Sequence, residues 1–158
     1  VQAEEGELYP SVAGSDGTMG HVLACESRVQ NDWQQKEADR KTYIDMDGTA
    51  VFKFAVRKMP EMAKSLMTQM HCTEADIDWF ITHQANERII EAIAKRLKSD
   101  IAKFPMNIAE CGNTSSASIP ILLDEMNRSG QLKDGQKIIM AGFGAGLSWG
   151  AVYMEWHA

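Results

Sequence analysis

Residues 79–98, WFITHQANERIIEAIAKRLK, decide how this chain folds. An apolar run typical of a buried strand comes first, a polar corner at residues 83–86 follows, and an amphipathic helix completes the segment. The apolar residues of the helical part fall on one face: Ile89, Ile90, Ile93, Ala94 and Leu97. His83 stands at the carboxyl end of the predicted strand, the edge at which α/β proteins place their chemistry. The segment therefore predicts an α/β fold with a functional group at this bend.

The composition fits one globular domain and argues against several classes of protein. The chain has 158 residues, 44% of them hydrophobic, which suffices for a single buried core. Its formal net charge of −6 argues against nucleic-acid binding, because the chain could not neutralise a phosphate backbone. No apolar run reaches the ~20 residues of a membrane helix, and the first residues lack the pattern of a signal peptide. We therefore expect a soluble, cytoplasmic protein that binds neither nucleic acid nor membranes.

The cysteines predict neither a disulfide framework nor a metal site. Cys25, Cys72 and Cys111 are odd in number and widely separated, and no CxxC spacing occurs. Reduced thiols in a reducing compartment fit this pattern. Cys111 could serve as a nucleophile, but its neighbours offer no cationic group or obvious helix start to lower its pKa. This context favours a buried, inert thiol.

The first third of the chain predicts short elements. We expect the end of a strand at residues 6–13, a turn at residues 14–17, a short strand at residues 21–26, and a loop or surface helix at residues 31–41.

A long helical pattern opens at residues 46–48. Apolar residues recur at steps of three or four and should form its buried face: Phe52, Val56, Met59, Ala63, Leu66 and Met70. Pro60 lies inside this pattern, and because proline has no N–H donor, it predicts a kink or a break.

The second half alternates between strand and helix patterns. An N-cap pattern at Thr73 precedes the strand at residues 77–82. Small residues at 112–118 lead into a helix that holds Pro120 in or near its first turn. The remaining elements are a central strand at residues 137–141, a glycine loop at residues 142–146 and a last strand at residues 148–156. This alternation predicts an α/β domain with a mainly parallel or mixed sheet covered by helices.

His83 and Asn113 are the first candidates for chemistry, and each allows two interpretations. His83 could cap a helix or bond a backbone carbonyl, or its neutral imidazole could donate a hydrogen bond to a developing oxyanion. Asn113 lies between Gly112 and Thr114. It could be an ordinary turn residue, or its side-chain amide could be a second donor aimed at the same oxygen.

Two further features could contribute to a site. The glycine loop does not fit a nucleotide site, since GxGxxG fails at Leu147 and a strand rather than a helix follows. Such a loop could instead present backbone N–H groups to an oxyanion. The predicted helix also carries a basic cluster, which is either an ordinary solvated face or a docking surface for an acidic partner: Arg88, Lys95, Arg96 and Lys98.

Three of these motifs, in their order and spacing, resemble the β-ketoacyl-acyl carrier protein synthase III family. They are residues 83–86 (HQAN), residues 112–118 (GNTSSAS) and residues 142–150 (GFGAGLSWG). Residues 14–17 and residues 46–52 (MDGTAVF) also resemble family segments. The similarity covers nearly all of this chain but only the C-terminal half of the family's thiolase fold. It assigns residues 1–40 to the end of the N-terminal half and a connecting segment, and residues 41–158 to the C-terminal thiolase-like domain.

The resemblance implies an acyltransferase of fatty-acid biosynthesis. Such an enzyme joins a short acyl-CoA to malonyl-acyl carrier protein in a decarboxylating Claisen condensation. His83 and Asn113 would stabilise the enolate that decarboxylation forms. A backbone N–H at Ala145 would help to form the oxyanion hole within the loop that borders the site: Phe143, Gly144, Ala145 and Gly146.

The resemblance also implies binding residues and partners. Asn86 and Gly48 would line the pantetheine tunnel. The basic cluster would become the docking face for acyl carrier protein, through Arg88, Lys95 and Arg96. Acyl-CoA and the phosphopantetheine of the carrier protein would be substrates, with no cofactor and no metal. The complete enzyme would be a homodimer.

The family's nucleophilic cysteine belongs to the N-terminal half, and none of the three cysteines here lies in a matching context. We therefore expect a fragment that is inactive without the cysteine-bearing half. Two alternatives stay open. One is a non-catalytic module that binds acyl carrier protein or CoA, and the other is a related acyl-CoA condensing enzyme with a different primer.

Overall fold

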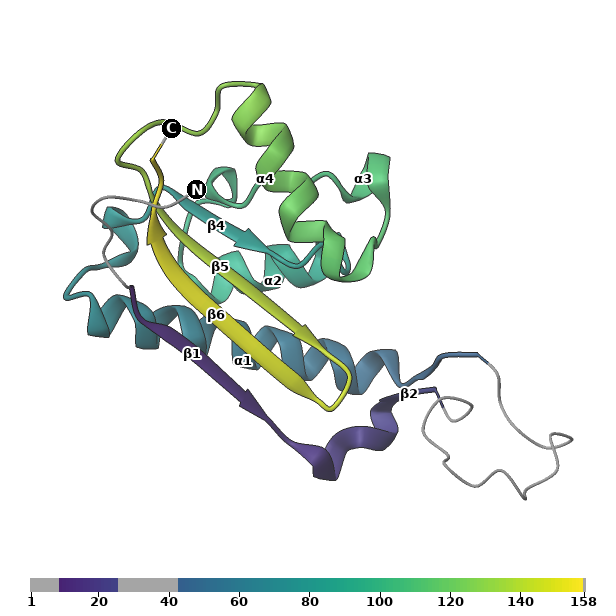
Figure 1. Ribbon diagram of the computed structural model, residues 1–158. Coiled ribbons are helices and arrows are strands. Elements are labelled where there is room, and N and C mark those ends of the chain that lie inside the picture. Colours follow the sequence, from purple (N-terminus) through teal and green to yellow (C-terminus); the bar gives the residue numbers. More distant parts are fainter. Residues whose placement is uncertain (1–8, 26–42, 158) are drawn as a thin grey trace, which may run out of the picture.

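The computed structural model describes residues 9–25 and 43–157, and its centre is a four-stranded mixed β-sheet (Figure 1). The strand order is β1-β6-β5-β4, in which β4 runs parallel to β5, while β1 and β5 run antiparallel to β6. The strands of this sheet are β1 (Ser11–Ser15), β4 (Trp79–Thr82), β5 (Lys137–Gly144) and β6 (Ser148–Glu155). A separate ribbon pairs β2 (Leu23–Ala24) with β3 (Asp45–Met46). The prediction of a mixed sheet is confirmed.

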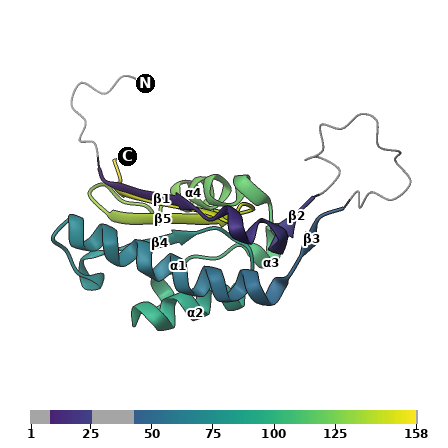
Figure 2. The same ribbon diagram turned by 90° about the horizontal axis from the view of Figure 1, so that it is seen from below.

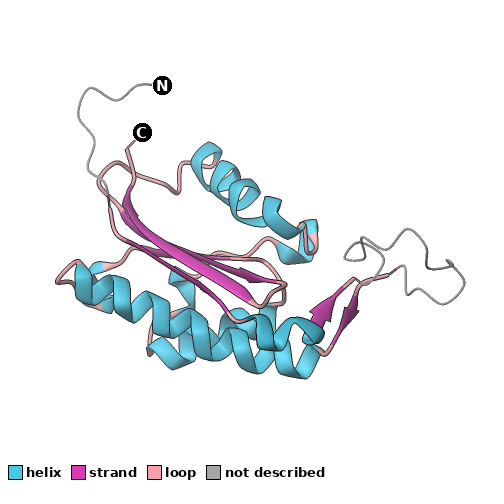
Figure 3. Ribbon diagram, turned by 60° about the horizontal axis from the view of Figure 1, so that its bottom comes forward, coloured by secondary structure: helices cyan, strands magenta, loops and turns pink. Residues whose placement is uncertain are grey.

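Helices cover both faces of the sheet (Figure 2). α1 (Gly48–Gln69) and α2 (Glu87–Leu97) lie side by side on one face, and α4 (Ser118–Arg128) lies on the other. Short helices fill several of the connections (Figure 3): η1 (Gly17–Val22), η4 (Glu74–Asp76), η5 (Ile101–Lys103), α3 (Ile108–Cys111) and η6 (Ser115–Ala117). Within residues 9–25 and 43–157, no helix combines the length and the apolar character needed to cross a membrane.

The core has one layer on each face of the sheet. The larger layer packs α1 and α2 against the sheet, and there Phe80 of β4 stacks on Phe104 with ring centroids 4.9 Å apart. The smaller layer packs α4 against Ile81 and Ile138. Because successive side chains of a strand point to opposite faces, neighbouring residues of β4 serve different layers. The apolar stripe predicted for α2 is buried in the larger layer, as expected.

Helix α1 differs from its predicted form in two ways. The helix runs unbroken through Pro60, so of the two predicted outcomes, a kink or a break, the break is wrong and the kink stays a prediction. Because Pro60 has no N–H, the carbonyl of Val56 loses its usual donor, and Nη1 of Arg96 on α2 donates to that oxygen at 3.2 Å. The predicted buried face is wrong at Phe52, which is 37% exposed, while Phe54 takes a place in the core.

The N-terminal elements begin and end at other residues than predicted. Gly14 belongs to β1 rather than to a turn. It pairs with Trp149 of β6, and a Cβ at residue 14 would come within 2.6 Å of the indole. The turn begins at Asp16, whose carboxylate accepts from the N–H of Thr18 at 3.0 Å and caps η1. Of the predicted strand at residues 21–26, the described residues 21–25 contain only β2, because η1 includes the first two.

Two predictions for this part of the chain fall on residues that the structure does not describe. They are the loop or surface helix at residues 31–41 and the domain boundary between residues 40 and 41. Both stay predictions.

Strand β5 extends further than its sequence predicts. Gly142, Phe143 and Gly144 were expected in a loop, but they pair with residues 148–150 of β6. The turn between the two strands is therefore confined to residues 145–147. As a result, Phe143 projects from a paired strand, which holds its ring more firmly than a loop would.

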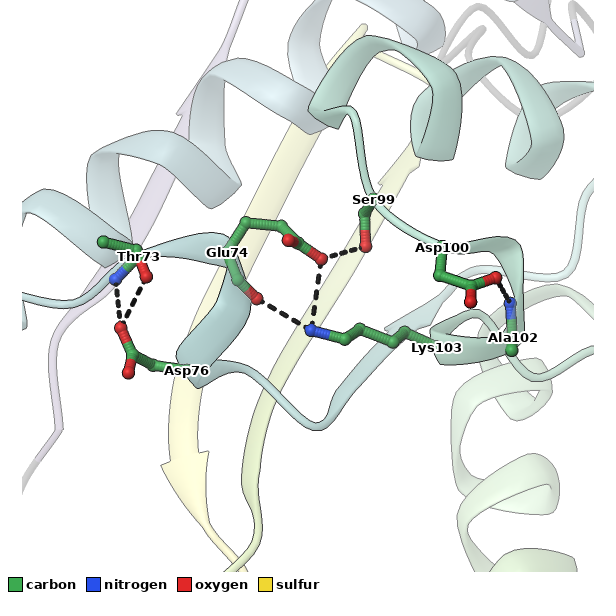
Figure 4. A network of polar contacts seen from close by, with 7 residues as sticks. All are labelled: Thr73, Glu74, Asp76, Ser99, Asp100, Ala102 and Lys103. Carbon is green, nitrogen blue, oxygen red and sulfur yellow. Dashed lines mark hydrogen bonds and ion pairs between the residues drawn. The ribbon is translucent and has the colours of Figure 1, made fainter.

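A polar network secures the amino end of β4 (Figure 4). The carboxylate of Asp76 accepts from the backbone N–H and the hydroxyl of Thr73, at 2.7 and 2.6 Å, which confirms the predicted cap. The carboxylate of Glu74 binds Nζ of Lys103 at 3.2 Å and accepts from the hydroxyl of Ser99. Because Ser99 and Lys103 follow α2, this network fixes the end of α2 to the segment that leads into β4.

Candidate functional site

One cavity collects most of the site residues predicted from the sequence. It has a volume of about 1320 Å³ and lies where the carboxyl ends of β4 and β5 meet the starts of α1 and α2 and the β2–β3 ribbon. The predicted residues that line it are Gly48, His83, Asn86, Arg88, Asn113, Phe143, Gly144 and Ala145. The predicted residues outside its lining are Lys95, Arg96 and Gly146.

His83 follows β4 directly, and both its backbone and its ring are held. Its N–H donates to the carbonyl of Ala141 at 2.9 Å, which continues the pairing of β4 with β5. Its half-buried ring contacts Phe143 edge-on, with centroids 5.6 Å apart. Nδ1 lies 2.6 Å from the hydroxyl oxygen of Ser118, so Nε2 is the ring nitrogen left for the cavity. Burial lowers the pKa of His83 below its ordinary value of 6.5, which keeps the imidazole neutral at neutral pH.

Asn113 offers its amide nitrogen, because its amide oxygen is already used. Oδ1 accepts from the backbone N–H of Ser115 at 2.9 Å, which forms a local turn. Ser115 has a φ of 56° there, a left-handed conformation that this turn stabilises. Among the described residues, Nδ2 of Asn113 has no hydrogen-bond partner, and the side chain lines the cavity. Asn113 is therefore arranged as a donor.

Asn86 repeats this arrangement at the start of α2. Its Oδ1 accepts from the N–H of Arg88 at 2.9 Å and caps the helix, so its amide nitrogen is again the group left for the cavity. Gly48 begins α1 on the opposite wall. A Cβ at residue 48 would meet only the end of the Met46 side chain, at 4.0 Å. Glycine at this position keeps the wall open rather than relieving a clash.

The turn between β5 and β6 adds a backbone donor. The N–H of Ala145 has no backbone partner within the described part of the chain, whereas its carbonyl accepts from the hydroxyl of Ser148 at 2.9 Å. Ala145 lines the cavity, and Gly146 does not. Gly146 instead has a φ of 140°, a conformation that side chains rarely adopt, so its place in the turn is conformational.

The polar groups left for the cavity are chiefly donors. They are the amide nitrogens of two asparagines whose oxygens are engaged and the N–H of Ala145, joined by Nε2 of His83, which donates when it carries the ring proton. Serine hydroxyls, which can donate or accept, line another part of the wall. A lining of this kind favours a ligand rich in acceptors, such as a carbonyl group, a carboxylate or an enolate.

The three basic residues predicted to dock a partner lie in different surroundings. Arg88 is exposed and lines the cavity. Lys95 is exposed on α2 outside the cavity lining. Arg96 donates to the carbonyl of Val56, so its guanidinium already has a structural contact with α1.

The cysteines also differ in their surroundings. Cys111 is exposed, so the expectation of a buried thiol is wrong, because the short α3 carries it to the surface. Loss of hydration and the nearby carboxylates of Glu125 and Glu110 raise the pKa of this thiol. Burial raises the pKa of Cys72. Cys25, which the sequence did not single out for the site, lines the cavity beside the β2–β3 ribbon.

Two buried polar residues beside His83 were not predicted. Ser118 is 2% exposed and contacts the imidazole, as described above. Gln84 is fully buried, where its side chain donates to the carbonyl of Thr82 at 2.8 Å and accepts from the N–H of Asn107 at 3.3 Å. Gln84 and Ser118 lie within two of the motifs that carry the resemblance, but their contacts were not predictable, because only the fold brings Ser118 and Asn107 to the bend.

A family model described as 3-Oxoacyl-[acyl-carrier-protein (ACP)] synthase III C terminal matches residues 67–156. The β-ketoacyl-[acyl-carrier-protein] synthase III of Clostridium novyi (strain NT) is 43% identical over 158 residues, which cover 99% of this chain and 49% of that protein. The protein of the same name from Clostridioides difficile (strain 630) is 43% identical over 155 residues, which cover 96% of this chain and 47% of that protein. The chain spans about half the length of the curated relatives it matches.

Solved structures give the same result. The 3-oxoacyl-(acyl carrier protein) synthase III of Pseudomonas aeruginosa PAO1 matches with a TM-score of 0.84 and 36% identity, over 100% of this chain and 47% of that chain. The 3-oxoacyl-[acyl-carrier-protein] synthase III of Aquifex aeolicus VF5 matches with a TM-score of 0.85 and 34% identity, over 98% of this chain and 46% of that chain. These likenesses confirm the predicted α/β fold of a thiolase-like C-terminal half.

Proposed function

The chain belongs to the family of 3-oxoacyl-[acyl-carrier-protein] synthase III C-terminal domains, and from this membership we propose that it is half of a condensing enzyme. The proposed enzyme joins a short acyl-CoA to malonyl-acyl carrier protein, with loss of carbon dioxide, at the start of fatty-acid biosynthesis in the cytoplasm. Its nucleophilic cysteine belongs to the other half, so this chain is inactive alone. The complete enzyme is a homodimer.

The observation that supports this function best is the cluster of donors at the carboxyl end of β4. Decarboxylation of a malonyl thioester moves the electrons of the broken C–C bond onto the thioester carbonyl and produces an enolate. Nε2–H of His83 and the amide of Asn113 donate to this oxygen as its charge develops. The N–H of Ala145 assists the next step, in which the enolate carbon attacks an acyl group and the cysteine thiolate leaves.

The neutral state of His83 suits this role. A neutral imidazole donates one hydrogen bond without bringing a full charge into a half-buried site. Because the donors are already fixed by Ser118, Ser115 and the turn after β5, little reorganisation is needed when negative charge appears on the substrate.

The walls of the cavity support a thioester carried on a long arm. The amide of Asn86 can donate to an amide carbonyl of pantetheine, and Gly48 keeps the opposite wall clear. Arg88 lies at the same cavity and is exposed, where it can meet an acidic carrier protein. We expect Arg88→Glu to weaken carrier-protein binding, and added salt to weaken binding of the unmodified chain.

The function is tested by adding the missing half. The chain is mixed with the N-terminal half of the Clostridium novyi relative, acetyl-CoA and malonyl-acyl carrier protein, and carbon dioxide release and condensation are measured. Activity should need both halves and should fall about 10³-fold with His83→Ala, whereas Ser65→Ala on the exposed side of α1 should leave it unchanged. Acylation of this chain by acetyl-CoA alone, detected by intact mass, would contradict the proposal. So would a stable complex of the two halves that releases no carbon dioxide.

A second candidate function is a module that only binds acyl carrier protein or CoA. It rests on the donor-lined cavity and the exposed Arg88 beside it, since binding needs these groups even without the cysteine-bearing half. This candidate predicts carrier-protein binding that is equal with and without the other half, and no carbon dioxide release in either case. The same mixing experiment therefore separates the two functions.

A further inference from the structure

Ser118 connects the start of α4 to the two residues that follow β4. It is the first residue of α4 and is 2% exposed. Its hydroxyl oxygen lies 2.6 Å from Nδ1 of His83 and 3.3 Å from the backbone nitrogen of Gln84. One buried hydroxyl group therefore contacts both the ring of His83 and the backbone beside it.

The hydrogen atoms of this group can be assigned from its contacts. The backbone N–H of Gln84 can only donate, so the oxygen of Ser118 accepts there. If Nδ1 of His83 also donated, the hydroxyl hydrogen would need a further acceptor, and the described residues offer none within hydrogen-bond distance. If Ser118 donates to Nδ1, every hydrogen atom of this buried group has a partner. The second arrangement leaves Nδ1 bare and places the imidazole proton on Nε2.

We propose that Ser118 is a positioning residue that holds His83 as the Nε2–H tautomer and directs that N–H into the cavity. The inference deepens the proposed function, because an enolate oxygen needs a donor at Nε2 and a bare nitrogen there would repel it. The position of the imidazole proton of His83 is nevertheless a property of the isolated chain. It can be measured without substrate, without the other half and without activity.

The tautomer is read directly from the protein labelled with ¹⁵N at its histidines. A long-range ¹H–¹⁵N correlation spectrum distinguishes a protonated ring nitrogen from a bare one, and the signals of His83 are those that disappear in His83→Ala. The three other histidines of the chain, His21, His71 and His157, serve as internal references. We expect the Nε2–H pattern for His83 in the unmodified chain. An Nδ1–H pattern would overturn the proposal, and this result needs no variant that might fold poorly.

Variants show whether Ser118 is the cause. Ser118→Ala should give a mixture of both tautomers, Ser118→Thr should restore the Nε2–H pattern because it keeps the hydroxyl, and Ser65→Ala should leave the spectrum unchanged. An unaltered His83 pattern in Ser118→Ala would overturn the proposal. With the other half added, Ser118→Ala should lower kcat about 10–100-fold with little change in KM. An inactive mixture that still shows the expected tautomers would count against the proposed function and not against this inference.

Discussion

The polar groups at the two ends of strand β4 differ in how fully they are hydrogen-bonded within the protein. At the amino end, Glu74, Ser99 and Lys103 satisfy one another (Figure 4). At the carboxyl end, His83 and Asn113 each bond one polar atom to the protein and leave another for the cavity. A completed network stabilises the fold, whereas an incomplete one costs stability until a ligand or solvent completes it. The comparison indicates that β4 is secured at one end so that its other end can present donors.

His83→Ala should have the largest effect, and it acts at the cavity end. Removing this donor should lower the rate of carbon dioxide release by the assembled halves about 10³-fold. The chain should still unfold in one cooperative transition, measured by circular dichroism during heating. Full activity of this variant would show that the carboxyl end of β4 has no catalytic role.

Asn113→Asp removes the amide donor of Asn113 while it keeps the oxygen that supports the local turn. A carboxylate oxygen can still accept from the N–H of Ser115, so the local turn should persist, but the amide donor is replaced by a negative charge. We expect about a 10²-fold loss of carbon dioxide release with an unchanged melting temperature. Asn127→Asp is the matched control, because Asn127 is exposed on α4 outside the cavity lining. Equal activity of the two variants would contradict the role of the Asn113 amide.

Glu74→Ala tests the opposite end of β4. It removes the carboxylate, which is 28% exposed and contacts Lys103 and Ser99, while Nζ of Lys103 can still donate to the backbone carbonyl of residue 74. The free energy of unfolding should fall by about 1 kcal/mol. Activity of the assembled halves should not change. Glu61→Ala, which breaks the more exposed pair with Lys58, should have almost no effect on urea unfolding. A loss of activity in Glu74→Ala would show that the two ends are not separable.

Arg96→Met tests whether Arg96 stabilises the fold rather than presenting a charge to a partner. Losing its bond to the carbonyl of Val56 should lower the free energy of unfolding by about 0.5–1 kcal/mol. In a Pro60→Ala background the new N–H can donate to Val56, so Arg96→Met should then cost less. Lys95→Met, at the exposed neighbouring position, is the control. Equal losses in both backgrounds would exclude this link between Arg96 and Pro60.

The pH dependence of stability should reveal the smallest effect. Burial lowers the pKa of His83 in the folded chain, so the unfolded chain takes up a proton first as the pH falls below the ordinary value of 6.5. Proton uptake by His83 therefore has no effect on stability above pH 6.5, and it lowers the free energy of unfolding below that pH. Urea unfolding of the unmodified chain and of His83→Ala at about pH 7.5 and about pH 5.5 measures the difference. The free energy of unfolding should fall more in the unmodified chain than in His83→Ala between these two pH values. A larger fall in His83→Ala would contradict a lowered pKa of His83.

Local patterns in the sequence predicted the elements that build the cavity better than the contacts within it. The stripe on α2 was predictable because helical periodicity depends only on nearby residues, and the buried residues of α2 confirm it. Gly14 was misassigned because glycine is common in turns, while the indole that requires it is on a strand far along the chain. The role of Ser118 was missed because a serine at the start of an apolar helix has many ordinary explanations.

The link between Arg96 and α1 was beyond sequence reasoning for a similar reason. The sequence shows that Pro60 deprives a carbonyl of its donor, but not that a neighbouring helix supplies another. The resemblance grouped Arg96 with Arg88 and Lys95, although only Arg88 lines the cavity. The catalytic and docking roles of these residues, and the domain boundary, stay predictions until they are measured.

The way in which Asn86 and Asn113 use their oxygens has a consequence for how the protein ages. In both residues the oxygen supports the backbone, and only the nitrogen is left for the cavity. Deamidation to aspartate would preserve the helix cap and the turn while it removed a donor and added a negative charge. An aged preparation would therefore stay folded and pass a test of thermal stability while it lost the donors that it presents to the cavity. Charge-resolved chromatography, rather than a melting curve, is the appropriate measure of its quality.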